Sequence, residues 1–133
     1  MIRAVADTHT VIWYLFRDPR LSGTARTTIE DAGAAGEQIA FSSITLAEIV
    51  YLAERGRIRA DTLERLLEVV EEENVVLVEV PSDHSVAQAM VNIPRAEVPD
   101  LPDRMIAATA ERLDVPVISR DRMIQASRIR TIW

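Results

Sequence analysis

Short apolar runs rich in β-branched residues alternate with longer segments of helical periodicity along the chain. A run that is apolar at every position is typical of a strand buried on both faces, and Val-Val-Leu-Val at 75–78 is the clearest example. Strands that alternate with helices of this length predict crossover connections and a parallel sheet covered on both faces. The predicted strands are 5–6, 39–41, 75–78 and 117–118, and 130–132 would add an edge strand.

Three segments between or after these runs carry apolar residues at the spacing of a helix with one buried face. The i, i+3, i+4, i+7 pattern is complete in 46–53 and in 63–70, and it continues at Ile106, Ala110 and Leu113. No linker and no repeat divides the sequence. We therefore predict an α/β fold, a three-layer α/β/α sandwich with a four- or five-stranded parallel sheet, forming one domain over residues 1–133.

The charged residues exclude several classes of protein. All 15 basic residues are arginine, 21 residues are acidic, the net charge is −6, and cysteine is absent. P-loop ATPases, pyridoxal-phosphate enzymes and Schiff-base aldolases need a lysine, so they are excluded, as are thiolate metal sites, cysteine nucleophiles and disulfide frameworks. The negative total also argues against nucleic-acid binding through a broad basic face.

The apolar run at 11–16 is too short to span a membrane, and it lacks the basic start and cleavage site of a signal peptide. We therefore expect a soluble cytoplasmic protein with no membrane partner.

Four acidic residues follow the predicted strands. In open parallel sheets, ligands bind beyond the carboxyl ends of the strands, where helix N-termini also gather. Carboxylates brought together there would repel one another unless a cation joined them, and oxygen ligands without cysteine or histidine favour Mg²⁺ or Mn²⁺ over zinc. The sequence therefore predicts an acidic metal site. Its candidate ligands are Asp7, Glu48, Asp103 and Asp121.

Each acid also has a purely structural explanation, which taken singly is the better one. Asp103 could complement a helix dipole in a first turn. Thr45 and Glu48 match a capping box, in which the glutamate reaches back to the backbone of the threonine. Only the combination of acids favours a metal site. The predicted N-cap positions are Asp7, Asp100 and Asp121, with Ser22 and Ser82-Asp83 opening other helices.

Other side chains near these acids allow two interpretations. His9 is either a general base or a packed or solvent-facing residue in the first turn of a helix. Trp13 could stack a nucleobase, but core packing is favoured. The arginines form two groups close in sequence to the proposed ligands, Arg55, Arg57 and Arg59 after the helix of Glu48, and Arg120, Arg122, Arg128 and Arg130 around Asp121.

Four segments of the sequence are distinctive when they are taken together, namely 6–9 with Trp13, 42–49, 100–110 and 117–121. The most distinctive stretch within them is Asp-Arg-Met-Ile-Ala-Ala-Thr-Ala at 103–110. Together they resemble the PIN domain, and most closely the VapC-type toxins of bacterial toxin–antitoxin pairs. The likeness runs in order across nearly the whole chain, which makes it more specific than any single motif.

The resemblance implies a small α/β/α ribonuclease with acids around Mg²⁺ or Mn²⁺. It places Asp7, Glu48, Asp103 and Asp121 at the catalytic and metal-binding positions. It also implies an RNA substrate, an antitoxin partner, a homodimer and a toxin–antitoxin hetero-oligomer. Positions beside the site, or candidates for substrate contact, are Thr8, Ser119, Asp100, Arg104 and Arg120.

The hypothesis from the sequence is therefore a Mg²⁺- or Mn²⁺-dependent endoribonuclease, the toxin of a toxin–antitoxin pair. Two alternatives stay open, an RNA-processing PIN nuclease outside such a pair and a non-catalytic PIN-like binding module. Phospho-aspartate domains are disfavoured. A receiver needs a lysine, and a haloacid-dehalogenase-like phosphatase needs a second aspartate where this chain has His9.

Overall fold

The computed structural model describes residues 1–133 and contains one five-stranded sheet in which every neighbouring pair is parallel. The strand order is β3-β2-β1-β4-β5, so the chain starts in the middle of the sheet and builds outward to both edges. This confirms the predicted α/β/α architecture with five strands. The strands are β1 (Ile2–Ala6), β2 (Gln38–Ser42), β3 (Leu77–Val80), β4 (Val117–Ile118) and β5 (Thr131–Ile132).

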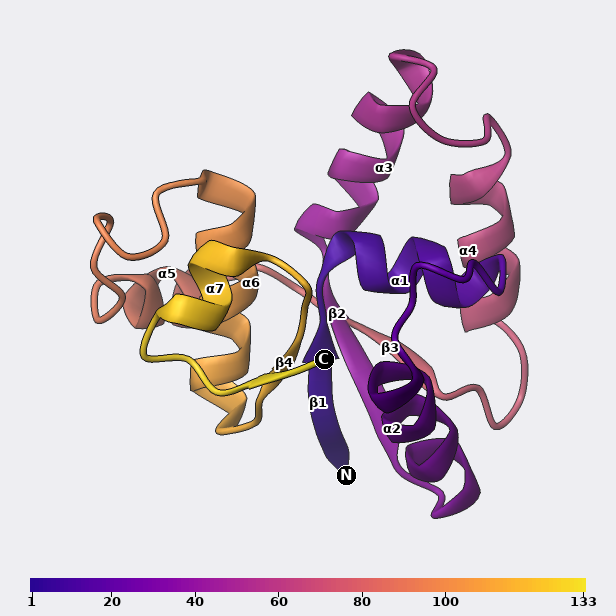
Figure 1. Ribbon diagram of the computed structural model, residues 1–133, viewed down its shortest axis with the longest axis horizontal. Helices are drawn as coiled ribbons and strands as arrows, with labels where there is room; N and C mark the ends of the chain where they lie inside the picture. The colour runs from indigo at the N-terminus through magenta and orange to yellow at the C-terminus, as the bar shows by residue number, and fades with distance from the viewer.

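Helices cover both faces of the sheet (Figure 1). One core contains Ala4 and Ala6 of β1 packed under the first four helices, and the other contains Val5 of β1 under the last three. Successive residues of β1 thus face opposite layers, as the pleat of a strand requires. The first layer comprises α1 (Thr8–Leu15), α2 (Gly23–Ala34), α3 (Ile44–Glu54) and α4 (Thr62–Val70); the second comprises α5 (His84–Met90), α6 (Leu101–Leu113) and α7 (Arg122–Ala126).

The three predicted helical segments lie within α3, α4 and α6. The expected helix starts at Ser22 and Asp83 are also present, since each side chain accepts a hydrogen bond from the backbone of the first turn. Helix α6 ends at Leu113, and its C-cap residue, Asp114, adopts the left-handed conformation at φ 54°. None of the helices has the length and apolar character needed to cross a membrane.

The predicted bounds of the third strand were wrong, and so was its predicted burial on both faces. Strand β3 comprises Leu77–Val80 instead of 75–78, and it lies at an edge of the sheet. Leu77 and Val80 are buried, whereas Glu79 is exposed. Val75 and Val76 precede the strand and pack against the first core. An apolar run shows that a segment is buried, but it does not distinguish pairing in a sheet from packing under a helix.

The carboxyl ends of β1, β2 and β4 lie at one edge of the sheet, where α1, α3 and α7 begin (Figure 1). A buried hydrogen bond fixes α1 there. The Thr10 hydroxyl, which is fully buried, donates to the carbonyl of Ile118 at 2.9 Å and so joins α1 to the end of β4.

Replacing this hydroxyl should loosen the edge of the sheet. We expect Thr10→Val to lower the free energy of unfolding by about 1 kcal/mol, because a buried hydrogen bond between two elements is removed while the Ile118 carbonyl keeps its bond from the Asp7 amide. Urea denaturation measures this. Thr28→Val removes a hydroxyl that bonds only within its own helix, so it should change the stability by less than about 0.5 kcal/mol. Equal decreases in the two variants would contradict the structural role of Thr10.

Candidate active site

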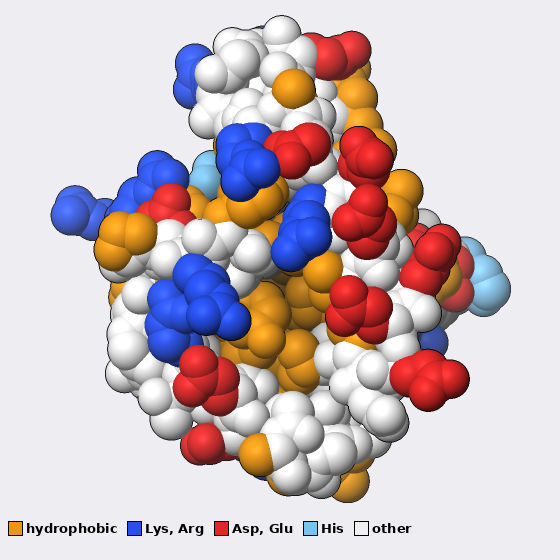
Figure 2. Space-filling view, turned by 90° about the vertical axis from the view of Figure 1, so that its right-hand side faces the viewer, with side chains coloured by type: hydrophobic (Ala, Val, Ile, Leu, Met, Phe, Trp, Pro, Cys, Tyr) orange, Lys and Arg blue, Asp and Glu red, His pale blue; other side chains and the backbone are white.

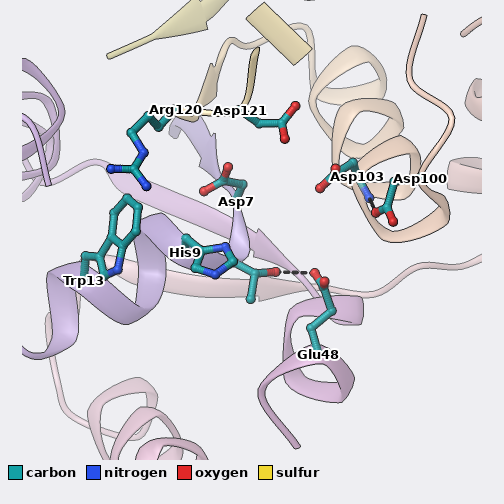
Figure 3. A pocket seen from close by; sticks show the side chains of 9 residues that line it. Asp7, His9, Trp13, Glu48, Asp100, Asp103, Arg120 and Asp121 are labelled. Carbon is teal, nitrogen blue, oxygen red and sulfur yellow. Dashed lines mark hydrogen bonds between the residues drawn. The ribbon is translucent and has the colours of Figure 1, made fainter. Parts of the chain in front are cut away.

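Five carboxylates line one pocket at the carboxyl edge of the sheet (Figure 3). The pocket has a volume of about 290 Å³, and a single hydrophobic residue contributes to its wall. All four predicted ligands are brought together there, as are Asp100, Thr8 and Arg120. The lining residues are Asp7, Thr8, His9, Trp13, Glu48, Asp100, Asp103, Arg120 and Asp121.

Asp7 is both an N-cap and a pocket residue. One oxygen of its carboxylate accepts a hydrogen bond from the Thr10 amide at 3.0 Å, and the other accepts one from the Ser119 hydroxyl. Ser119 is fully buried, and its Oγ also accepts a hydrogen bond from the Asp121 amide at 3.0 Å. This small network fixes the orientation of the Asp7 carboxylate and ties it to the loop that carries Asp121.

Glu48 does not form the predicted capping box. Helix α3 begins at Ile44, with Ser43 at its N-cap position and no side-chain capping bond, so Thr45 lies inside the helix and is buried. The Thr8 hydroxyl instead donates to the Glu48 carboxylate at 2.5 Å and lies 3.0 Å from the Thr45 hydroxyl. Burial raises the pKa of Glu48, and the carboxylates of Asp100 and Asp7 add to the rise, whereas the bond from Thr8 opposes it.

Asp100, Asp103 and Asp121 come from the starts of two helices. Asp100 caps α6 by accepting a hydrogen bond from the Asp103 amide at 3.1 Å, and Asp121 caps α7 by accepting one from the Ile124 amide at 3.0 Å. Burial and, after it, the neighbouring carboxylates, with that of Asp100 first, raise the pKa of Asp103 to about 7. The pocket therefore holds more negative charge than its residues alone can balance.

The donor set fits a hard divalent cation. Every acidic ligand offers carboxylate oxygens, the ligands that Mg²⁺ and Mn²⁺ prefer. No group of three or more acidic or histidine side chains is arranged to hold one ion by direct contact alone. Mg²⁺ commonly keeps several waters and uses only one or two protein carboxylates, so direct contact with three is not required.

Two residues of α1 complete the wall of the pocket opposite Asp103. Trp13 is only 4% exposed, so its ring packs in the core as favoured and is not free to stack a nucleobase. His9 is exposed, and its ring centroid lies 5.5 Å from that of Trp13. Both positions could be anticipated from the sequence. His9 and Trp13 are the second and sixth residues after Asp7, so they fall in the first two turns of the helix that Asp7 caps.

Arg104 lies outside the pocket, although it follows Asp103 directly. Its guanidinium donates to the backbone carbonyls of Ile93 at 3.0 Å and Met90 at 2.9 Å. It therefore anchors the segment between α5 and α6. Adjacent residues of a helix point in directions about 100° apart, so Arg104 can lie outside the pocket that Asp103 lines. Its role in contacting substrate or supporting the site stays a prediction.

The fold and the pocket together define an α/β/α protein with an acidic, cation-attracting site at the carboxyl edge of a parallel sheet. The sequence matches the PIN domain over residues 4–129. The chain therefore belongs to the PIN domain family.

Several known proteins are similar to this chain over its full length. Ribonuclease VapC22 of Mycobacterium tuberculosis is 29% identical over 138 residues, covering 100% of both chains. The DNA-bound VapBC structure from Salmonella typhimurium covers 98% of this chain and 97% of that chain, with a TM-score of 0.68 and 27% identity. VapBC2 from Rickettsia felis, bound to a DNA fragment from the promoter, has a TM-score of 0.72 at 16% identity, with 98% and 97% of the two chains covered.

The burial of Asp103 and the crowding of carboxylates around it predict an unusual pH dependence of stability in the metal-free protein. The pKa of Asp103 is about 7 in the folded protein and 3.8 in its ordinary state, so the folded chain binds more protons than the unfolded chain between these values. The free energy of unfolding should therefore fall as the pH rises from about 4 to 7. Because Asp103 is partly exposed, we expect Asp103→Asn to raise stability at pH 8 by about 1–2 kcal/mol, less than the full shift implies.

Urea denaturation in EDTA at pH 5 and pH 8 tests this. Asp31→Asn, on the exposed surface of α2, is the matched control and should follow the wild type. If the stability of Asp103→Asn falls between the two pH values as much as that of the wild type does, burial and the neighbouring carboxylates do not raise the pKa of Asp103 as described.

Proposed function

We propose that this protein is a divalent-metal-dependent endoribonuclease that hydrolyses phosphodiester bonds of RNA. The observation that carries the proposal is the pocket in which Asp7, Glu48, Asp103 and Asp121 meet at the carboxyl edge of the sheet. Membership of the PIN domain family and full-length similarity to a ribonuclease support it.

Asp7 and Asp103 are the first candidates for direct contact with Mg²⁺ or Mn²⁺, and Glu48 and Asp121 would bind directly or through water. A cation bound there would lower the pKa of a water molecule and neutralise charge on the phosphate. The bonds from Ser119 and Thr10 hold Asp7 in one orientation, and the bond from Thr8 does the same for Glu48, so little ordering of these side chains is needed on binding.

The pocket offers neither a thiol nor a free hydroxyl as a nucleophile. Cysteine is absent from the sequence, and the one hydroxyl that lines the pocket, that of Thr8, is engaged with Glu48. We assign the attack on the phosphate to water, which a bound cation would activate. Asp103, with its raised pKa, can hold a proton near neutral pH until a cation replaces it.

Removing one pocket carboxylate should reduce the rate of RNA cleavage without unfolding the protein. We expect the purified protein to cleave single-stranded RNA in Mg²⁺ or Mn²⁺ and not in EDTA. Asp103→Asn should reduce the rate by at least about 100-fold, because the site is deprived of a charged ligand while keeping its shape. A gel assay with end-labelled RNA measures the rate.

Asp31→Asn serves again as the control, since it removes an aspartate that lies away from the pocket. Full activity of Asp103→Asn would overturn the assignment of that residue. A wild-type protein that binds RNA but never cleaves it would instead favour a non-catalytic binding module.

We further propose that the protein is the toxin of a toxin–antitoxin pair, acts in the cytoplasm on RNA, and forms a homodimer that binds an antitoxin. Two features support a protein partner. The similar structure from Salmonella typhimurium is a VapBC complex, and the face formed by α1, α2 and α4 has an apolar hollow between arginine and acidic side chains (Figure 2). Apolar surface gathered in a hollow with a charged rim is typical of protein-binding sites.

Co-expression with the product of the adjacent gene tests this partner. We expect a stable complex in size-exclusion chromatography with light scattering, with more than one copy of each chain, and inhibition of RNA cleavage when the partner is present. Asp103→Asn should still bind the partner, since the substitution changes one carboxylate of the acidic pocket and removes no apolar surface. If the neighbouring product does not bind, an RNA-processing role outside such a pair becomes the better interpretation.

A further inference from the structure

Arg120 is the only arginine that lines the acidic pocket, and it has no carboxylate partner. Six arginines of the chain form ion pairs within 4.0 Å, and Arg120 is not among them, although five carboxylates share its pocket. It also makes no hydrogen bond through its side chain to another residue, and that side chain is exposed. Its guanidinium donors are therefore free.

The contact that holds Arg120 is with an aromatic ring. Its guanidinium carbon lies 4.6 Å from the centroid of the Trp13 ring, on the side of Asp7 away from Asp103 (Figure 3). Trp13 itself is buried and packs against His9 and Trp133 at centroid distances of 5.5 and 5.9 Å. A guanidinium that stacks on an indole ring keeps its charge, and the N–H donors at its edge stay available for hydrogen bonds. The stacking also restricts its movement.

In this position Arg120 is paired with none of the five pocket carboxylates. It therefore leaves their oxygens available to a metal ion. The Trp13 ring holds the guanidinium at the rim instead, where it can meet a ligand that enters from solvent. A planar guanidinium with free donors matches the two oxygens of a phosphodiester, which it can bind in a bidentate manner.

We propose that Arg120, positioned by Trp13, binds a backbone phosphate of single-stranded RNA next to the phosphate that enters the acidic pocket. The inference rests on the proposed nuclease function, and it adds the group that brings a polyanion to a protein of net charge −6. Arg120 thus contributes binding and orientation of the strand, while the carboxylates serve the reacting phosphate. The contact is with the backbone, so it is independent of base sequence.

Kinetics of RNA cleavage test this with matched variants. We expect Arg120→Gln to raise KM about 10-fold with kcat changed by less than about 3-fold, because the contact exists both before and in the transition state. The slope of log affinity against log salt concentration, measured with labelled RNA in an Asp103→Asn background, should fall in magnitude by about 0.7, because one fewer phosphate is neutralised. Arg120→Lys should recover part of the affinity, since it restores the charge but not the planar fork.

Two controls separate this role from general effects. Arg122→Gln removes the same charge two residues further on, from an exposed side chain that does not line the pocket. Arg20→Gln removes a second guanidinium that lies over Trp13, 5.2 Å from the ring centroid, but is paired with Asp18. In both variants KM should stay within about 2-fold of the wild type and the salt slope should be unchanged, because neither side chain is expected to touch a phosphate.

Each remaining outcome overturns the proposal. If Arg120→Gln cleaves RNA with unchanged KM and salt slope, Arg120 binds no phosphate, although the nuclease function stands. The same holds if Arg122→Gln has an equal effect, or if Arg120→Gln weakens only the complex with a protein partner. If the wild type neither binds nor cleaves RNA, the proposed function fails, and this inference fails with it.

Discussion

The arrangement of the site depends on one constraint, the mutual repulsion of the five carboxylates that line the pocket. Three of the five acids are held by helix N-termini, since Asp7, Asp100 and Asp121 each accept a backbone hydrogen bond from the first turn of the helix that they open. The positive end of a helix dipole favours an anion at that position. The fold thus offsets part of the repulsion with the same groups that start α1, α6 and α7. At Asp103 the remaining repulsion adds to the effect of burial, and together they raise the pKa to about 7.

Much of this arrangement could be predicted from the sequence because it depends on local patterns. The alternation of strands and helices indicates a parallel sheet, and such a sheet places the residues after its strands at one edge. A helix cap and a residue of the acidic site are not true alternatives, because Asp7 and Asp121 are caps and pocket residues at once. Capping a helix occupies one lone pair of one carboxylate oxygen, so a capping aspartate can line the pocket at the same time.

The wrong predictions concern information that local patterns do not hold. The capping box at Thr45–Glu48 failed because α3 begins before Thr45, and only the tertiary contact with Thr8 decides where Glu48 points. The third strand was shifted because an apolar run does not show which residues pair. The direction of the Arg104 side chain is likewise not visible in local patterns, because it is set by hydrogen bonds to the carbonyls of Ile93 and Met90. In each case the deciding partner is distant in sequence.

Helix α1 links the negative and the positive parts of the site. Its cap, Asp7, is one of the pocket carboxylates, and six residues later Trp13 lies under the guanidinium of Arg120. Without the five pocket carboxylates, the chain has 16 acidic residues and 15 arginines, so these charges nearly balance. The negative net charge is therefore largely a property of the pocket, not of the surface that a polyanion would first meet. An acidic protein can approach RNA in this way, because its excess charge lies where a divalent cation can balance it and an arginine stands fixed at the rim.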